Sequence, residues 1–217
     1  MKQFFILCVF AFASASAFVI PSLTLDPLQQ IKRIVPEIFN LTDLRVDLDD
    51  IKSSISPGKC PEATELPEPF KLNSFLGTWY EIKRTGQIFE NGLRCVQANY
   101  KLDQAAGNVI VNNSGVNPKG KPVATIGTAA TTDKSNVFAV KFFPLSPSAQ
   151  YWVVDTDYTG YSLVVSCNNV FGFFNINDAW ILSRKPSLDN EIIQKLEAKV
   201  IELGFTKLRF TDTPQDC

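Results

Sequence analysis

The sequence predicts an all-β protein, an eight-stranded antiparallel up-and-down β-barrel with one α-helix near the C-terminus packed outside it. Short segments that alternate between apolar and polar residues follow one another from residue 60 onward, and turn-forming residues separate them. A single pattern of helical spacing comes after the last of these segments. Eight strands leave no residues for a second covering sheet, and closing the sheet into a barrel removes its exposed edges.

The first seventeen residues form a predicted signal peptide. Lys2 supplies the positive charge, residues 4–12 the apolar core, and Ala15-Ser16-Ala17 the small residues of a cleavage site. No later segment is apolar over a membrane-spanning length. We therefore expect a secreted, extracellular protein.

Residues 18–59 read as an amphipathic helical extension. Asp26 and Pro27 fit the start of a short helix that ends near Pro36. A second helical spacing ends at Ser56-Pro57-Gly58. It consists of Leu44, Leu48, Ile51 and Ile55. This arm either packs on the main domain, faces a lipid or protein partner, or is a locally docked propiece.

Residues 60–217 contain the predicted strands. The clearest alternation runs from Val96 to Leu102, where every second residue is apolar. Turns such as Ala106-Gly107-Asn108 and Thr159-Gly160 punctuate the pattern. Together with an opening strand around Trp79, the predicted strands are 96–102, 109–111, 123–128, 137–142, 151–156, 161–166 and 179–183.

The predicted helix covers about residues 188–203. Ser187 is its expected N-cap, and Gly204 stands where a C′ glycine belongs. One face is apolar and should pack on the outside of the sheet. Its residues are Ile192, Leu196, Val200 and Leu203.

Composition excludes several classes of site. The chain has no histidine, so histidine-based catalytic triads, metal sites and haem ligation are absent from it, and we expect no catalytic residues, metal or cofactor. Removing Lys2 from 21 basic residues leaves 20 against 22 acidic ones, a net charge near −2 with no basic block, which disfavours nucleic acid as a partner. Asn40 and Asn112 begin Asn-x-Ser/Thr sequons and are candidate glycosylation sites.

Four cysteines remain after cleavage of the signal peptide, namely Cys60, Cys95, Cys167 and Cys217. In an oxidising compartment an even number suggests two disulfides, and four cysteines allow three pairings. None of them lies in a CxxC pair.

The stretch Gly77-Thr78-Trp79, the stretch Thr156-Asp157-Tyr158 and Arg184 after "AWILS" resemble, in order and spacing, the three sequence blocks of lipocalins. The resemblance covers about residues 60–217 and is strongest to the branch with apolipoprotein D and insect bilin-binding proteins. It implies that Trp79 plugs one end of the barrel, that Gly77 lets the backbone bend there, and that Arg184 covers the indole. It also implies disulfides Cys60–Cys167 and Cys95–Cys217.

The resemblance further implies a secreted protein that binds and transports a small hydrophobic ligand, such as a fatty acid, sterol, retinoid or bilin. Implied ligand contacts are Tyr100, Asn113, Phe142, Thr156, Tyr158, Trp180 and Leu182. The alternative is an interaction protein that contacts a membrane, lipoprotein or protein partner through the arm and the apolar loop "FFPL". Since Met1 is the only methionine and the cysteines should be paired, we expect no enzymatic activity. The sequence does not determine the oligomeric state.

Overall fold

A computed structural model describes residues 53–86, 90, 92–143, 148–170 and 172–217. The predicted signal peptide, most of the predicted arm and the Asn40 sequon lie outside the described residues.

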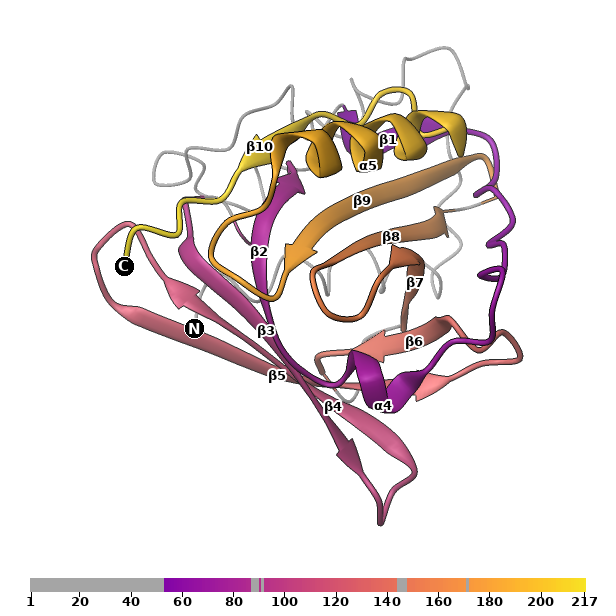
Figure 1. Cartoon of the computed structure of the whole chain (residues 1–217). Coiled ribbons are helices and arrows are strands. Elements are labelled where there is room, and N and C mark those ends of the chain that lie inside the picture. The colour runs from indigo at the N-terminus through magenta and orange to yellow at the C-terminus, as the bar shows by residue number, and fades with distance from the viewer. Residues whose placement is uncertain (1–52, 87–89, 91, 144–147, 171) are drawn as a thin grey trace, which may run out of the picture. The chain divides into compact units, whose positions relative to one another are not determined.

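Eight antiparallel strands close into a barrel, as predicted (Figure 1). Neighbours in sequence pair with one another, and β9 pairs back with β2 from Tyr80↔Ser183 to Arg84↔Trp180. The strands are β2 (Gly77–Thr85), β3 (Arg94–Asp103), β4 (Asn108–Val116), β5 (Pro122–Thr131), β6 (Val137–Lys141), β7 (Ala149–Thr156), β8 (Tyr161–Val170) and β9 (Phe174–Ser183). A short helix, α4 (Leu72–Phe75), precedes β2.

Strand β1 (Ile55–Pro57) corrects one sequence prediction. We expected the helical spacing of the arm to include Ile55, but this residue pairs with Ile176 of β9. The reason is that β2 ends at Thr85, before it reaches the first residues of β9. The backbone groups left there need partners, and residues 55–57 supply them.

The C-terminal segment completes the barrel wall. Strands β2 and β3 pair only from Gly77 to Tyr80 and then diverge. β10 (Phe210–Asp212) pairs with the last residues of β2, and the Gln215 amide donates to the carbonyls of both Glu81 (2.8 Å) and Val96 (2.9 Å). The tail therefore bridges the two strands where they separate.

Helix α5 (Asn190–Glu202) lies along the outside of the barrel beside β9 (Figure 1). Its N-cap is Asp189 rather than Ser187, and the Asp189 side chain accepts a hydrogen bond from the backbone of Glu191 at 2.8 Å. Ser187 lies before the helix, and its backbone carbonyl accepts a hydrogen bond from the Ser183 hydroxyl. The helix ends at Glu202 with Leu203 as its C-cap, and Gly204 follows as the predicted C′ glycine with a φ of +94°.

Two separate apolar cores follow from the alternation of the strands. The outer core packs α5, through Leu196 and Val200, onto outward side chains of the barrel such as Ile181. The inner core fills part of the barrel interior. Among the described residues, its buried members are Phe70, Phe75, Trp79, Tyr100, Val109, Val111, Ala129, Phe138, Val140, Val153, Val164 and Leu182.

Both disulfides have the pairing that the resemblance implies. Cys60 pairs with Cys167, which ties the segment before α4 to β8. Cys95 pairs with Cys217, which ties the C-terminal tail to the start of β3.

Candidate functional site

Trp79 and Arg184 close one end of the barrel. The Trp79 side chain is fully buried, and its indole N–H donates to the Phe75 carbonyl at 2.8 Å. The Arg184 guanidinium carbon lies 3.7 Å from the centroid of the indole ring. A cation–π contact of this kind contributes about 1–2 kcal/mol when it is shielded from water.

Arg184 also holds together the backbone around this closed end. Its guanidinium donates hydrogen bonds to the carbonyls of Thr78 (2.8 Å), Leu76 (3.0 Å) and Tyr158 (3.1 Å), as well as to those of Ser74 and Phe75. Gly77, between two of these carbonyls, has a φ of +95°, a conformation that side chains disfavour. The arrangement is structural, since each of the three guanidinium nitrogens donates to a backbone carbonyl.

The loop Thr156–Tyr158 belongs to the same closed end. The Thr156 hydroxyl accepts from the Tyr158 backbone and donates to the Tyr161 carbonyl, and the Asp157 carboxylate accepts from the backbone N–H groups of residues 159–161. The Tyr158 ring lies 5.8 Å from that of Phe70. These contacts assign Thr156 and Tyr158 a structural role, and ligand contact there stays a prediction.

A hydrogen bond between two tyrosines crosses the barrel interior. Tyr100 on β3 and Tyr151 on β7, four strands apart in the sheet, place their hydroxyl oxygens 2.5 Å from each other. A series of aromatic rings at centroid distances of 5.2–6.3 Å leads from Trp79 through Phe75, Tyr100 and Tyr151 to Trp180. We call the hydrogen-bonded pair Tyr100–Tyr151 the tyrosine crossbar.

Burial of the inward side chains changes at the crossbar. On β9, Leu182 is buried, whereas Trp180 and Asp178, further from the closed end, are half-buried. The same change occurs from Val153 to Tyr151 on β7. It recurs from Val111 to Asn113 on β4 and from Val140 to Phe142 after β6. The interior is therefore packed near the closed end and keeps accessible surface beyond the crossbar.

Five of the predicted ligand residues share this inner face. Tyr100 and Leu182 belong to its buried part, and Asn113, Phe142 and Trp180 to its half-buried part. A Cβ atom on residue 127 would lie 2.7 Å from the Phe142 ring, which is too close. The glycine at this position therefore leaves room for the ring. Contact of these residues with a ligand stays a prediction.

Sequence reasoning missed a group of charged side chains in the interior. Glu81 and Arg84 of β2 form a buried ion pair at 2.6 Å, and the Thr213 hydroxyl donates to the same Glu81 oxygen. The Glu90 carboxylate accepts from the Trp180 indole N–H at 3.3 Å. Burial, together with the charge of Glu81, raises the pKa of Glu90 well above its usual value.

Asp178 is the fourth member of this group. It lies on the inner face of β9, two residues from Trp180, and burial raises the pKa of its carboxyl to about 7. The side chain is nevertheless only half-buried. A group that is surrounded by protein and still has accessible surface is typical of the wall of an internal hollow.

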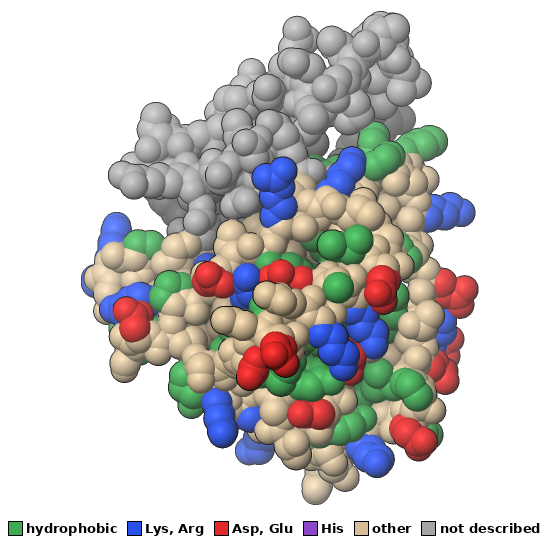
Figure 2. Space-filling view, turned by 45° about the horizontal axis from the view of Figure 1, so that its top comes forward, with side chains coloured by type: hydrophobic (Ala, Val, Ile, Leu, Met, Phe, Trp, Pro, Cys, Tyr) green, Lys and Arg blue, Asp and Glu red, His purple; other side chains and the backbone are tan. Residues whose placement is uncertain are grey.

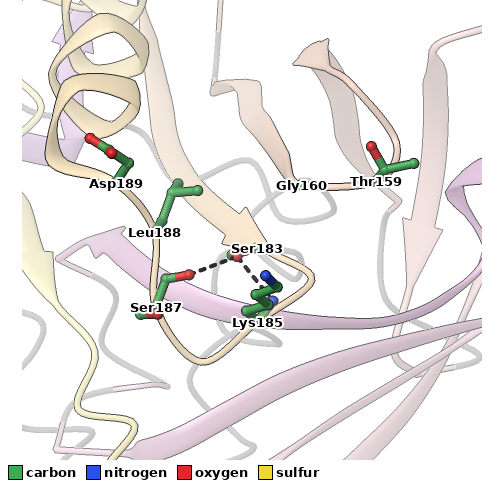
Figure 3. A pocket seen from close by; sticks show the side chains of 7 residues that line it. All are labelled: Thr159, Gly160, Ser183, Lys185, Ser187, Leu188 and Asp189. Atoms are coloured by element: carbon green, nitrogen blue, oxygen red, sulfur yellow. Dashed lines mark hydrogen bonds between the residues drawn. The ribbon is translucent and has the colours of Figure 1, made fainter.

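Outside the barrel, a surface pocket of about 330 Å³ lies at the closed end, between the loop with Thr159 and Gly160 and the segment that leads into α5 (Figure 3). The Ser183 hydroxyl donates to the Ser187 carbonyl and accepts from the Lys185 backbone, both at 3.1 Å. These polar groups stabilise the local turn, and none of the predicted ligand residues lines this pocket.

Acidic and basic side chains are interspersed on the face shown in Figure 2. Among the described residues, no three Cys, Asp or Glu side chains come together as metal ligands. In that same part of the chain, no helix has the length and apolar character needed to cross a bilayer.

Comparison with known proteins decides the family. The family profile described as "Lipocalin-like domain" matches residues 70–215. The chain belongs to the lipocalin family. It is 39% identical to apolipoprotein D of Mus musculus over 160 residues, which cover 73% of this chain and 83% of the relative.

Solved lipocalin structures resemble the barrel as well. Insecticyanin from the tobacco hornworm Manduca sexta is 26% identical, with a TM-score of 0.60 over 73% of this chain and 87% of that one. Lobster apocrustacyanin A1 has a TM-score of 0.62 over 76% and 92% of the two chains, at 22% identity, and shows the fold alone. Lipocalins typically bind small hydrophobic ligands.

Proposed function

We propose that this lipocalin is secreted and carries a small hydrophobic ligand inside the barrel, between the tyrosine crossbar and the mouth, the end of the barrel away from Trp79. The observation that carries the proposal is the change from buried to half-buried inward side chains at Tyr100 and Tyr151. Aromatic side chains, Phe142 and Trp180 among them, form part of the wall. A fatty acid, sterol, retinoid or bilin fits such a wall.

Apolar contact would supply most of the binding free energy. Removing about 300 Å² of apolar ligand surface from water contributes about 7 kcal/mol before the entropic cost of association is subtracted. Polar groups on the inner face, such as the Asn113 amide, would orient the ligand.

Native mass spectrometry of the protein secreted by eukaryotic cells tests this proposal. We expect removal of residues 1–17 and a co-purified ligand that dissociates on denaturation. Trp180→Ala should weaken rebinding of that ligand about tenfold or more, whereas Ile126→Ala, on the exposed outer face of β5, should not change it. A chain that stays in the cell, or that neither carries nor takes up an apolar ligand, would contradict the proposal.

A second function, contact with a lipid surface, is favoured by one observation. Phe173 is 73% exposed in the turn between β8 and β9. This turn lies at the mouth, because β9 runs from it towards Arg184. Exposed aromatic side chains at such a tip favour a membrane or lipoprotein surface.

Asn112 is also proposed as a glycosylation site. It lies on the outer face of β4, since its cross-strand partners are Asn99 and the exposed Ile126. Enzymatic removal of N-glycans should lower the mass of the secreted protein, and Asn112→Gln should abolish the part of that shift that belongs to this sequon.

A further inference from the structure

We propose that the tyrosine crossbar is the inner end of the ligand site and that it receives a neutral oxygen of the ligand, a ketone, ester or hydroxyl, while a carboxylate end is excluded from this depth. The inference rests on the proposed carrier function and names its ligand class.

The first argument is a count of protons. The two hydroxyls of Tyr100 and Tyr151 have two protons, and the hydrogen bond between them uses one. Neither hydroxyl has another hydrogen-bond partner among the described residues. The pair therefore retains one O–H donor and free lone pairs on the inner face of the barrel.

That donor is present at every physiological pH. Burial is the main cause that raises the pKa of Tyr100 and of Tyr151 above the usual value for a phenol, so neither hydroxyl ionises. A buried donor without an acceptor costs free energy, and a ligand oxygen that accepts from it removes this cost.

The charged neighbours decide what kind of oxygen fits. The Glu90 carboxyl accepts from the indole N–H of Trp180, whose ring lies 6.3 Å from that of Tyr151, and burial raises the pKa of Glu90, so the ionised form of a carboxyl is disfavoured beside the crossbar. Asp178 lies on the same inner face. The guanidinium of Arg84 is already bound to Glu81, Thr213 and the Leu93 carbonyl. A ligand carboxylate at this depth would lose its hydration where burial already disfavours ionised carboxyls, and Arg84, the cation that the described residues place beside Glu81, is already bound; a neutral oxygen would not bear this cost.

The crossbar also sets the depth of the site. The ring centroid of Phe75 lies 5.3 Å from that of Tyr100, on the side of the crossbar that faces the closed end. The inward residues between Phe75 and the closed end are buried. On the other side, the Trp180 ring lies 6.3 Å from that of Tyr151 and offers an apolar face to the ligand next to its oxygen.

A series of ligands with one carbon chain tests the inference. The delipidated full-length protein is titrated with 2-dodecanone, 1-dodecanol, dodecanoate and dodecane, all below their aggregation limits, by calorimetry. We expect the ketone and the alcohol to bind about tenfold more tightly than dodecanoate and about threefold more tightly than dodecane. If dodecanoate binds as tightly as the ketone, or more tightly, the inference that the crossbar receives a neutral oxygen is wrong.

Variants show whether the named groups cause the preference. Tyr151→Phe should weaken the ketone and the alcohol about three- to tenfold and leave dodecane unchanged. Tyr161→Phe is the matched control, because Tyr161 packs against the outer core. At pH 8, above the pKa of about 7 of Asp178, Asp178→Asn removes a negative charge from the inner face and should bind dodecanoate more tightly than the unchanged protein does.

The two proposals fail in different ways. If no member of the series binds, dodecane included, the carrier function itself is wrong. If all four bind and Tyr151→Phe affects them equally or not at all, the carrier function stands and the role of the crossbar is wrong. Thermal unfolding of each variant identifies one that has not folded, and Tyr100→Phe then provides a second test of the same donor.

Discussion

The guanidinium of Arg184 stacks on the indole of Trp79 at 3.7 Å and, in the same position, donates to five backbone carbonyls at the closed end of the barrel. One side chain therefore links β9, β2, α4 and the loop before β8. A planar group with five N–H donors can do this, and an ammonium group cannot.

Arg184→Lys should lower the free energy of unfolding by about 2–4 kcal/mol, because carbonyls that now accept from the guanidinium lose their donor. Urea unfolding followed by tryptophan fluorescence measures this. Lys185→Met, at the exposed neighbouring position, is the control and should change stability by less than about 0.5 kcal/mol. Equal stability of the two variants would show that the hydrogen bonds of Arg184 contribute little.

The Glu81–Arg84 pair should behave as a buried ion pair whose members depend on each other. Arg84→Met alone leaves the Glu81 carboxylate with the Thr213 hydroxyl and without its cation, which should cost about 3–5 kcal/mol. The double variant Glu81→Leu/Arg84→Met removes both charges and should cost less than Arg84→Met. Chemical unfolding of Glu81→Leu, Arg84→Met and the double variant measures the coupling. If the losses of unfolding free energy in the two single variants add up to the loss in the double variant, the two side chains are not coupled.

Asp178 should make stability depend on pH. Its pKa in the folded protein, about 7, is higher than the value of about 3.9 for an unfolded chain. At pH values between about 3.9 and about 7, Asp178 is protonated in the folded state and ionised in the unfolded state. The unfolding free energy therefore falls as pH rises through this range towards 7. Asp178→Asn should therefore gain stability relative to the unchanged protein from pH 4 to pH 8. Urea midpoints across this range measure the difference, with Asp133→Asn at an exposed turn as control.

Phe173 should anchor the mouth to lipid if the second proposed function holds. Phe173→Ser should reduce flotation with lipid vesicles about threefold or more, because an exposed aromatic side chain loses its apolar contact. Ile126→Ser is the matched control, because Ile126 is 65% exposed and lies on the outer face of β5. If both variants float like the unchanged protein, membrane contact does not depend on this tip.

Local patterns in the sequence were sufficient for the barrel. Alternation in residues 96–102, together with the short apolar segments between turn residues and the opening stretch around Trp79, predicted eight strands, and the resemblance placed Trp79 and Arg184 together. The start of α5 was misplaced by two residues, because Ser187 and Asp189 are both good caps and only the tertiary contact of Ser187 with Ser183 distinguishes them. β1 and β10 are too short for alternation to reveal, and they form because β9 and β2 leave backbone groups without partners.

The interior was harder to predict than the fold. Glu81 and Arg84 are three residues apart, so strict alternation would put them on opposite faces, and an irregularity between Glu81 and Lys83 brings them together. Tyr151 could have been found from its alternation with Val153, but its contact with Tyr100 joins strands that are not neighbours. Such a contact depends on the curvature of the closed sheet, which no local pattern specifies.

The tail that bridges β2 and β3 has a consequence for biosynthesis. Gln215 reaches backbone carbonyls that precede it by 134 and 119 positions, and Cys95 must wait for Cys217 to find its partner. The wall is thus sealed only after translation has passed residue 217. Until then the nascent barrel has a seam between its first two strands, and on the proposed route of secretion this seam is where chaperones and disulfide-forming enzymes would act.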